Sequence, residues 1–471
     1  MTTVLAIDQG TSGTKALVVA PDGQVLGLSE IAVRPTYSAG GAVEHDPRLI
    51  LESILESGRG AIAQARTEVD VVTLANQGET VLAWDPATGA PLTEMIVWQD
   101  RRAEGVCREL SGHGDEIAAR TGLVLDPYFS APKQAWIRRN LTADGVVTTS
   151  DTWLLHQLTG EFVTDASTAS RSLIADLDTV RWDAELLELF GLGDERLPDI
   201  LSSDAIAGTT RAFGRETPVG GLVVDQQAAL LAESCLRPGE AKCTFGTGAF
   251  LLANTGTGAR RSSAGLSASV AWSIGDHPTY CLDGQVYTAA SAIRWMEGLG
   301  FIGHAADLDR VSEPDSAGVF SVPALAGLGA PWWRPDARAA IAGLSLSTGA
   351  GHIVRAVLEG IAAQVAELGE LVVRDIGQPL TRLRVDGGLT RSHVLMQSVA
   401  DLMQIEVDVY PSQHATPLGA AALARIACEP GTALEDAVIP WTPATVYAPR
   451  WSGERAAEFR ATWRALAEST R

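Results

Sequence analysis

The chain has 471 residues, enough for two domains, and 46% are hydrophobic against 20% charged, as in ordinary folded proteins. Its formal net charge of −21 argues against nucleic acid as a partner, because phosphate backbones are bound by basic surfaces. No apolar run approaches the roughly 20 residues of a membrane span, and the first residues lack the basic start of a signal peptide. Five cysteines without a C-x-x-C pair are typical of reduced thiols. We therefore expect a cytoplasmic protein with no membrane partner.

Apolar runs bounded by turn residues predict the elements of the first half of the chain. Strands are expected at 4–7, 16–20, 25–28 and 69–75. A helix is expected over 47–65, because Asp46 can cap it and Pro47 suits its first turn.

A similar order of elements begins again near residue 240. Strands are expected at 241–245 and 250–254, on either side of Gly246-Thr-Gly248. The Gly-Thr turns at 10 and 246 lie half a chain apart, which indicates either two similar domains across a cleft or a chance recurrence of a common turn. We expect domains at 1–237 and 238–471. Later elements are predicted as helices at 352–374, 392–403 and 417–423, and a strand at 383–385.

Three glycine-rich turns follow predicted strands and could hold phosphates. The first runs from Asp8 to Lys15, and the others cover 244–248 and 386–388. Backbone N–H groups and hydroxyls in such turns can converge on a phosphate, and Asp8 could hold Mg²⁺ through water. The alternative is a set of structural turns in which Asp8 is only hydrogen-bonded. A Walker A motif is absent from the sequence.

Asp225 ends the apolar run 221–224 and precedes an alanine-rich stretch. A carboxylate at the end of a buried strand would point into the cleft, where it could act as a general base. The alternative role for this aspartate is a helix N-cap.

Several motifs occur together and in order along nearly the whole chain. They cover residues 4–15, 78–80, 96–102, 121–130, 151–153, 225–227, 245–248, 327–332 and 386–388. Together they resemble the FGGY family of carbohydrate kinases, and most closely its glycerol kinase branch. The resemblance implies an α/β fold of two ribonuclease-H-like domains, of the actin-like ATPase and sugar kinase type, around a central cleft. It implies ATP and Mg²⁺ as cofactors and a small polyol or sugar as substrate.

The resemblance also implies a role for individual residues. Asp225 matches the catalytic base, and Asp8 matches the acid associated with Mg²⁺. The implied substrate-binding residues are Gly78, Glu79, Trp98, Tyr128, Asp225, Gln226 and Phe250. The implied nucleotide-binding residues are Thr11, Ser12, Gly13, Lys15, Gly246, Thr247, Ala290, Arg294, Gly387, Gly388 and Ser392. Lys15, Ala290, Arg294 and Ser392 differ from the residues usual in glycerol kinases.

The main departure from the glycerol kinase branch lies at residues 76–80. That branch typically reads N-Q-R-E-T, whereas this chain reads Asn-Gln-Gly-Glu-Thr. Losing a charge-assisted hydrogen bond from the missing arginine would cost about 1.5–3 kcal/mol. We therefore expect a substrate longer than glycerol, such as a tetritol, a pentitol or a ketose. Glycerol itself, giving glycerol 3-phosphate, is the alternative; a non-catalytic ATP- or sugar-binding sensor is the alternative of another class. A homodimer is left open.

Overall fold

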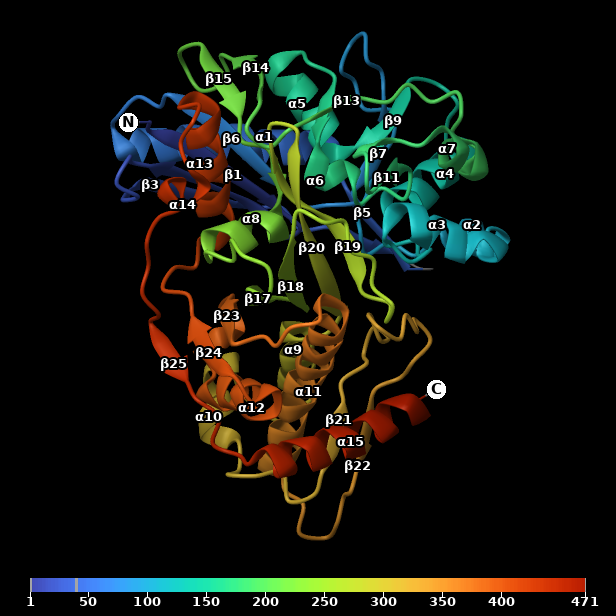
Figure 1. Ribbon diagram of the computed structural model, residues 1–471, viewed down its shortest axis with the longest axis vertical. Helices are drawn as coiled ribbons and strands as arrows, with labels where there is room; N and C mark the ends of the chain where they lie inside the picture. The colour runs from blue at the N-terminus through green and yellow to red at the C-terminus, as the bar shows by residue number, and fades with distance from the viewer. Residues whose placement is uncertain (1, 39–40, 471) are drawn as a thin grey trace.

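The computed structural model describes residues 2–38 and 41–470 and contains two large mixed β-sheets, one above the other in Figure 1. The strands of the first sheet, in spatial order, are β14 (Ile206–Thr210), β15 (Thr217–Gly220), β6 (Val71–Asn76), β1 (Val4–Gly10), β2 (Gly13–Val19) and β3 (Val25–Ala32), with β16 (Val223–Val224) also beside β6. The strands of the second sheet are β19 (Ser267–Ile274), β20 (His277–Val286), β18 (Ala249–Gly256), β17 (Ala241–Phe245), β23 (Arg382–Asp386), β24 (Glu406–Val409) and β25 (Thr445–Tyr447).

Both sheets repeat one strand arrangement. In the first, β1 is antiparallel to β2 and parallel to β6. In the second, β17 is antiparallel to β18 and parallel to β23. This repetition confirms the predicted α/β fold of two similar domains. The division after residue 237 stays a prediction.

Helices cover the sheets where the sequence predicts them. Helix α1 (Pro47–Ala65) has the predicted limits, and Asp46 accepts a hydrogen bond from the backbone N–H of Arg48. The long α11 (Ala350–Ile376) extends the predicted helix at both ends. The other helices of the first half are α2 (Glu104–Glu109), α3 (Gly114–Thr121), α4 (Ser130–Asn140), α5 (Ser150–Thr159), α6 (Ala166–Ala169), α7 (Ala184–Phe190) and α8 (Asp225–Ala232). Those of the second half are α9 (Ala290–Gly298), α10 (Leu308–Val311), α12 (His393–Met403), α13 (Ala415–Cys428), α14 (Leu434–Ala437) and α15 (Gly453–Ser469).

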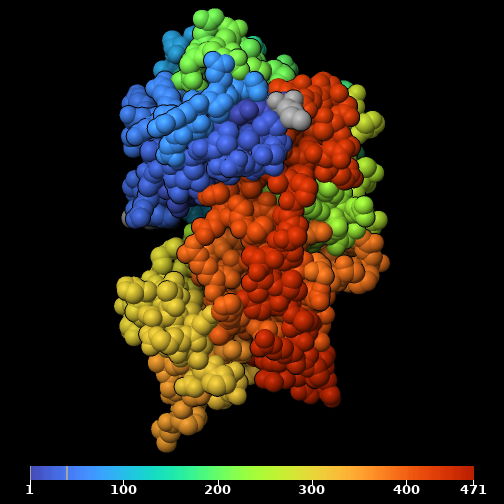
Figure 2. Space-filling view, turned by 90° about the vertical axis from the view of Figure 1, so that its left-hand side faces the viewer, coloured from blue at the N-terminus to red at the C-terminus, as the bar shows by residue number. Residues whose placement is uncertain are grey.

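Helix α13 comes late in the chain but packs on the first sheet. It lies beside β1 and β6 in Figure 1, and Figure 2 shows the red-orange segments against the blue N-terminal ones. Gly419 meets α8 so closely that a Cβ there would lie 1.8 Å from the carbonyl oxygen of Ala228. Because Leu418 and Ala424 are buried with Val4, packing stabilises this helix beyond the predicted 417–423.

A third sheet extends the first domain over the cleft. Its strands are β4 (Thr36–Ser38), β5 (Ala42–His45), β8 (Met95–Ile96), β7 (Val81–Trp84) and β9 (Val146–Thr149). Figure 2 shows the surface hollowed between the blue N-terminal segments and the yellow segments of the second domain. Among the residues that the structure describes, no helix is both long enough and apolar enough to cross a membrane.

Candidate active site

A cavity of about 680 Å³ lies in the cleft and brings together most of the predicted site. The carboxyl ends of β1, β6, β16 and β17 meet there, because the first three run parallel to one another. The predicted residues that line it are Thr11, Ser12, Gly78, Glu79, Trp98, Tyr128, Asp225, Gln226, Gly246, Thr247, Phe250 and Arg294.

Asp225 stands at the junction of β16 and α8, at the bottom of this cavity. It is the first residue of α8 and not its cap, which is Val224, and its Oδ1 accepts a hydrogen bond of 2.7 Å from the backbone N–H of Gln226. Burial, together with the carboxylates of Asp8 and Glu79, raises the pKa of Asp225 to about 7. A carboxylate with such a pKa can accept a proton at neutral pH, as a general base must.

Asp8 lies on β1, opposite Lys15 on β2. Burial raises the pKa of Asp8 to about 6 against the opposing charge of Lys15, and Asp386 adds to the rise. Three carboxylates, those of Asp8, Asp225 and Asp386, therefore interact unfavourably in the cleft. A bound cation would reduce this repulsion. Because no three acidic, histidine or cysteine residues among those described could hold a metal ion together, the residues fit an Mg²⁺ that Asp8 would hold through water, with other ligands from the phosphates.

Aromatic rings from both domains form the wall of the cavity. The ring of Trp98 packs edge-on against Tyr128 and Phe250, with centroids 5.6 and 5.8 Å apart. Tyr128 is held in place by the buried Lys133, whose ammonium donates to three successive carbonyl oxygens at 127–129 at distances of 2.6–2.8 Å. These rings can cover the carbon chain of a small substrate.

Glu79 is fixed by a buried ion pair that sequence reasoning missed. Arg171 pairs with Glu79 and also, at 3.0 Å, with Asp283 on β20 of the second sheet. Glu79 itself has a φ of 58°, a left-handed conformation that a non-glycine residue adopts only when its surroundings hold it. The one available signal was an arginine inside a stretch of small residues, 166–172.

Gly78 lines the cavity beside Glu79 without a side chain. A Cβ built there would have Val224 Cγ1 at 3.4 Å and Arg171 Nε at 3.9 Å as its nearest neighbours. Both are ordinary van der Waals distances. A single Cβ therefore fits at position 78, and it would contact the buried side chains of Val224 and Arg171.

The glycine-rich turns that are predicted to bind phosphate leave space beside their backbones. A Cβ at Gly10 or Gly246 would come no nearer than 3.5 and 3.9 Å to other atoms, and one at Gly388 would meet nothing within 4 Å. Such open backbone fits the triphosphate of ATP. Ala290 supports this region, because its N–H donates to the carbonyl oxygen of Gly246 at 3.0 Å.

Gly387 and Gly13, in contrast, lie against neighbouring backbone and leave no open space. A Cβ at Gly387 would lie 2.4 Å from the carbonyl oxygen of Phe245, and φ there is 95°. A Cβ at Gly13 would lie 2.5 Å from the carbonyl oxygen of Ile31. These two glycines let neighbouring backbones approach. Their predicted part in nucleotide binding would therefore be indirect.

Gly388 and Ser392 lie outside the main cavity. With Ala305, Ala306 and Leu308 they line a separate hollow of about 140 Å³. The Ser392 hydroxyl donates to Asp309 at 2.7 Å and caps α12. The predicted contact of these residues with the nucleoside stays a prediction.

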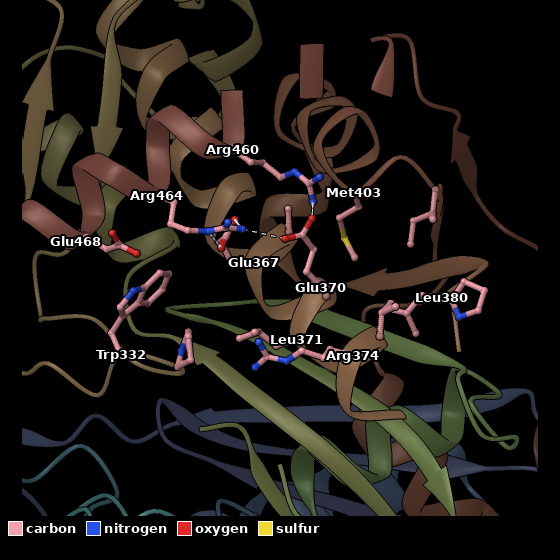
Figure 3. A pocket seen from close by; sticks show the side chains of 16 residues that line it. Trp332, Glu367, Glu370, Leu371, Arg374, Leu380, Met403, Arg460, Arg464 and Glu468 are labelled. Carbon is pink, nitrogen blue, oxygen red and sulfur yellow. Dashed lines mark hydrogen bonds and ion pairs between the residues drawn. The ribbon is translucent and has the colours of Figure 1, made fainter. Parts of the chain in front are cut away.

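A larger cavity of about 780 Å³ lies on the second domain, away from every predicted site residue. Figure 3 shows Arg460 and Arg464 directed at the carboxylates of Glu367 and Glu370. Because those charges are already paired, we place the active site in the cleft.

Comparison with known proteins identifies the family. Models of the N-terminal and C-terminal domains of the FGGY family of carbohydrate kinases match residues 3–232 and 241–428. The glycerol kinase of Trichlorobacter lovleyi is 40% identical and covers 100% of this chain and 99% of its own. That of Gloeobacter violaceus is 44% identical over 89% of this chain and 86% of its own. The crystal structure of Plasmodium falciparum glycerol kinase with ADP superposes with a TM-score of 0.91 at 32% identity, over 100% of this chain and 98% of that one. The chain therefore belongs to the FGGY family of carbohydrate kinases and is an ATP-dependent kinase.

Proposed function

We propose that this enzyme transfers the γ-phosphoryl group of ATP to a hydroxyl of a polyol or ketose with more carbons than glycerol, with Asp225 as the base. The observation that carries the substrate proposal is the absence of a side chain at Gly78, which lines the cavity next to Glu79. A longer chain can occupy the volume that an arginine takes in typical glycerol kinases.

The reaction follows from the positions of the side chains. A substrate hydroxyl gives its proton to Asp225, and its oxygen bonds to the γ-phosphorus as the bond to the ADP oxygen breaks. Ser12 and Thr247 line the same cavity and would donate hydrogen bonds to the phosphoryl oxygens, whereas the Thr11 hydroxyl already donates to Gln77. Asp8 would hold Mg²⁺, which neutralises phosphate charge when bound.

The substrate end combines apolar walls with a few polar groups. Trp98, Tyr128 and Phe250 would cover the carbon chain, while Glu79 and Gln226 contact its hydroxyls. Because the cavity joins side chains of both domains, closure of the cleft would exclude water as a competing acceptor.

Glycerol is the second candidate substrate. The relatives of 40% and 44% identity are glycerol kinases. Every proposed substrate-binding residue except Gly78 suits a three-carbon substrate too. A non-catalytic sensor is disfavoured, since binding alone gives no reason for a carboxylate of raised pKa between substrate and phosphates.

Location and assembly are further proposals. The five cysteines Cys107, Cys235, Cys243, Cys281 and Cys428 are all free thiols, which supports the cytoplasm as the location. A homodimer is left open, and light scattering of the purified enzyme would decide it.

A screen of ADP release across polyols and ketoses of three to six carbons tests the substrate proposal. We expect the highest kcat/KM with a substrate of four or five carbons. A higher kcat/KM with glycerol would establish the alternative, and ADP release that no acceptor stimulates would overturn the kinase assignment of the cavity.

A further inference from the structure

Lys242 is a buried cation directly behind the proposed active site. It lies on β17, between β18 and β23, and its side chain is inaccessible to solvent. Its ammonium donates to Oε1 of Gln226 at 2.5 Å and to the hydroxyl of Thr244 at 2.7 Å. Gln226 and Thr244 both line the catalytic cavity.

The chemistry of this contact fixes the orientation of the Gln226 amide. A lysine ammonium has three donors and no acceptor, so only the oxygen of the amide can face Lys242. The nitrogen, Nε2, must then point away from Lys242. Within the part of the chain that the structure describes, Nε2 has no protein acceptor, and the other side of Gln226 borders the cavity.

Acidic groups surround Lys242. Its charge lowers the pKa of the carboxyl groups of Asp225, Glu233 and Asp386 against the effect of burial. Such acidic neighbours compensate for the burial of an ammonium. Lys242 therefore places a positive charge behind Gln226, away from solvent.

We propose that Lys242 is a positioning residue for substrate recognition, which holds Gln226 so that its amide nitrogen donates to an oxygen of the acceptor. This inference rests on the proposed function. Gln226 then adds a donor beside two acceptors, Asp225 and Glu79. The substrate class that fits carries a hydroxyl or carbonyl oxygen next to the hydroxyl that is phosphorylated.

Gln226→Glu is the most direct test, because it separates the hydrogen bond to the substrate from the contact with Lys242. A glutamate keeps the contact with Lys242 as an ion pair but offers the substrate only acceptors. We expect the KM for the best acceptor found in the screen to rise about tenfold, the effect of one lost hydrogen bond. The KM for ATP and the Tm should stay at the wild-type values. A wild-type KM for the acceptor would overturn the inference.

A double-mutant cycle shows whether Lys242 acts through Gln226. Lys242→Met and Gln226→Ala should each raise the acceptor KM, and the double variant should be no worse than Gln226→Ala alone. Additive effects would overturn the inference. Arg425→Met is the matched control, because Arg425 is a buried cation that donates to the carbonyl oxygen of Ala20, outside the cleft. It should lower Tm and leave the acceptor KM unchanged.

The two proposals fail in different ways. If Lys242→Met does not fold, Lys242→Arg takes its place in the cycle. If the wild-type enzyme shows no acceptor-dependent ADP release, the proposed function is wrong and the inference falls with it. If the wild type is active but the cycle is additive, only the role of Lys242 is wrong.

Discussion

The indole Nε1 of Trp98 donates a hydrogen bond of 2.9 Å to the hydroxyl of Thr11, which in turn donates to Oε1 of Gln77 at 2.9 Å. Trp98 forms a wall of the proposed substrate end of the cavity, whereas Thr11 belongs to the first glycine-rich turn, which is predicted to bind phosphate. An acceptor packed against the indole would therefore lie at a fixed distance from this turn.

Trp98→Phe tests this connection, because it keeps an aromatic wall and removes the N–H donor. We expect kcat to fall about tenfold, since a misplaced acceptor reacts more slowly even when it binds. Steady-state kinetics with the best acceptor measures the effect. An increase confined to the acceptor KM would show instead that Trp98 acts only as an apolar surface.

Asp225→Asn should remove the base without changing the shape of the site. We expect kcat to fall by about 10²–10⁴-fold, the usual contribution of a general base, while ATP still binds in calorimetry. Loss of ATP binding in a folded variant would contradict the assignment.

The same variant should be more stable than the wild type at alkaline pH. The pKa of Asp225 is about 7 in the folded protein against an ordinary value of 3.8, so the folded state holds the proton more strongly. Ionisation of Asp225 therefore lowers wild-type stability as pH rises between these two values. The Tm of Asp225→Asn relative to wild type should increase from pH 4 to pH 8. A constant difference would argue against the raised pKa.

The pH profile of the reaction should report the same group. Only the carboxylate form of Asp225 can accept the proton, so kcat/KM should rise through a pKa of about 7. A profile that is flat down to pH 5 would show that Asp225 titrates like an exposed aspartate, or that another group is the base.

Gly78→Arg tests the substrate proposal directly. A Cβ at this position lies at van der Waals distance from Val224 and Arg171, and Gly78 is not in the left-handed region, so the Cβ itself causes no backbone strain. We expect the arginine to lower kcat/KM for the longer acceptor by about tenfold or more and to improve it for glycerol. Gly78→Ala is the control and should change neither strongly. Unchanged or higher activity with the longer acceptor would refute the proposal.

Local signals in the sequence predicted α1 because Asp46 and Pro47 define its start within a few residues. They underestimated α13, since its stability comes from contact with Val4 and Ala228, which are distant in sequence. They also missed the buried charges. Arg171 and Lys242 acquire their partners only when separate segments meet, and a single sequence does not show which carboxylates or amides will face them.

Glu79 and Asp283 come from the two halves of the molecule, yet they share one guanidinium, that of Arg171. Any movement that separates the two halves must therefore weaken the ion pairs that fix Glu79. An enzyme with an open cleft should then bind its substrate poorly. A genetic selection for growth on a different carbon source should therefore recover substitutions at Asp283, in the half of the protein that is predicted to bind the nucleotide.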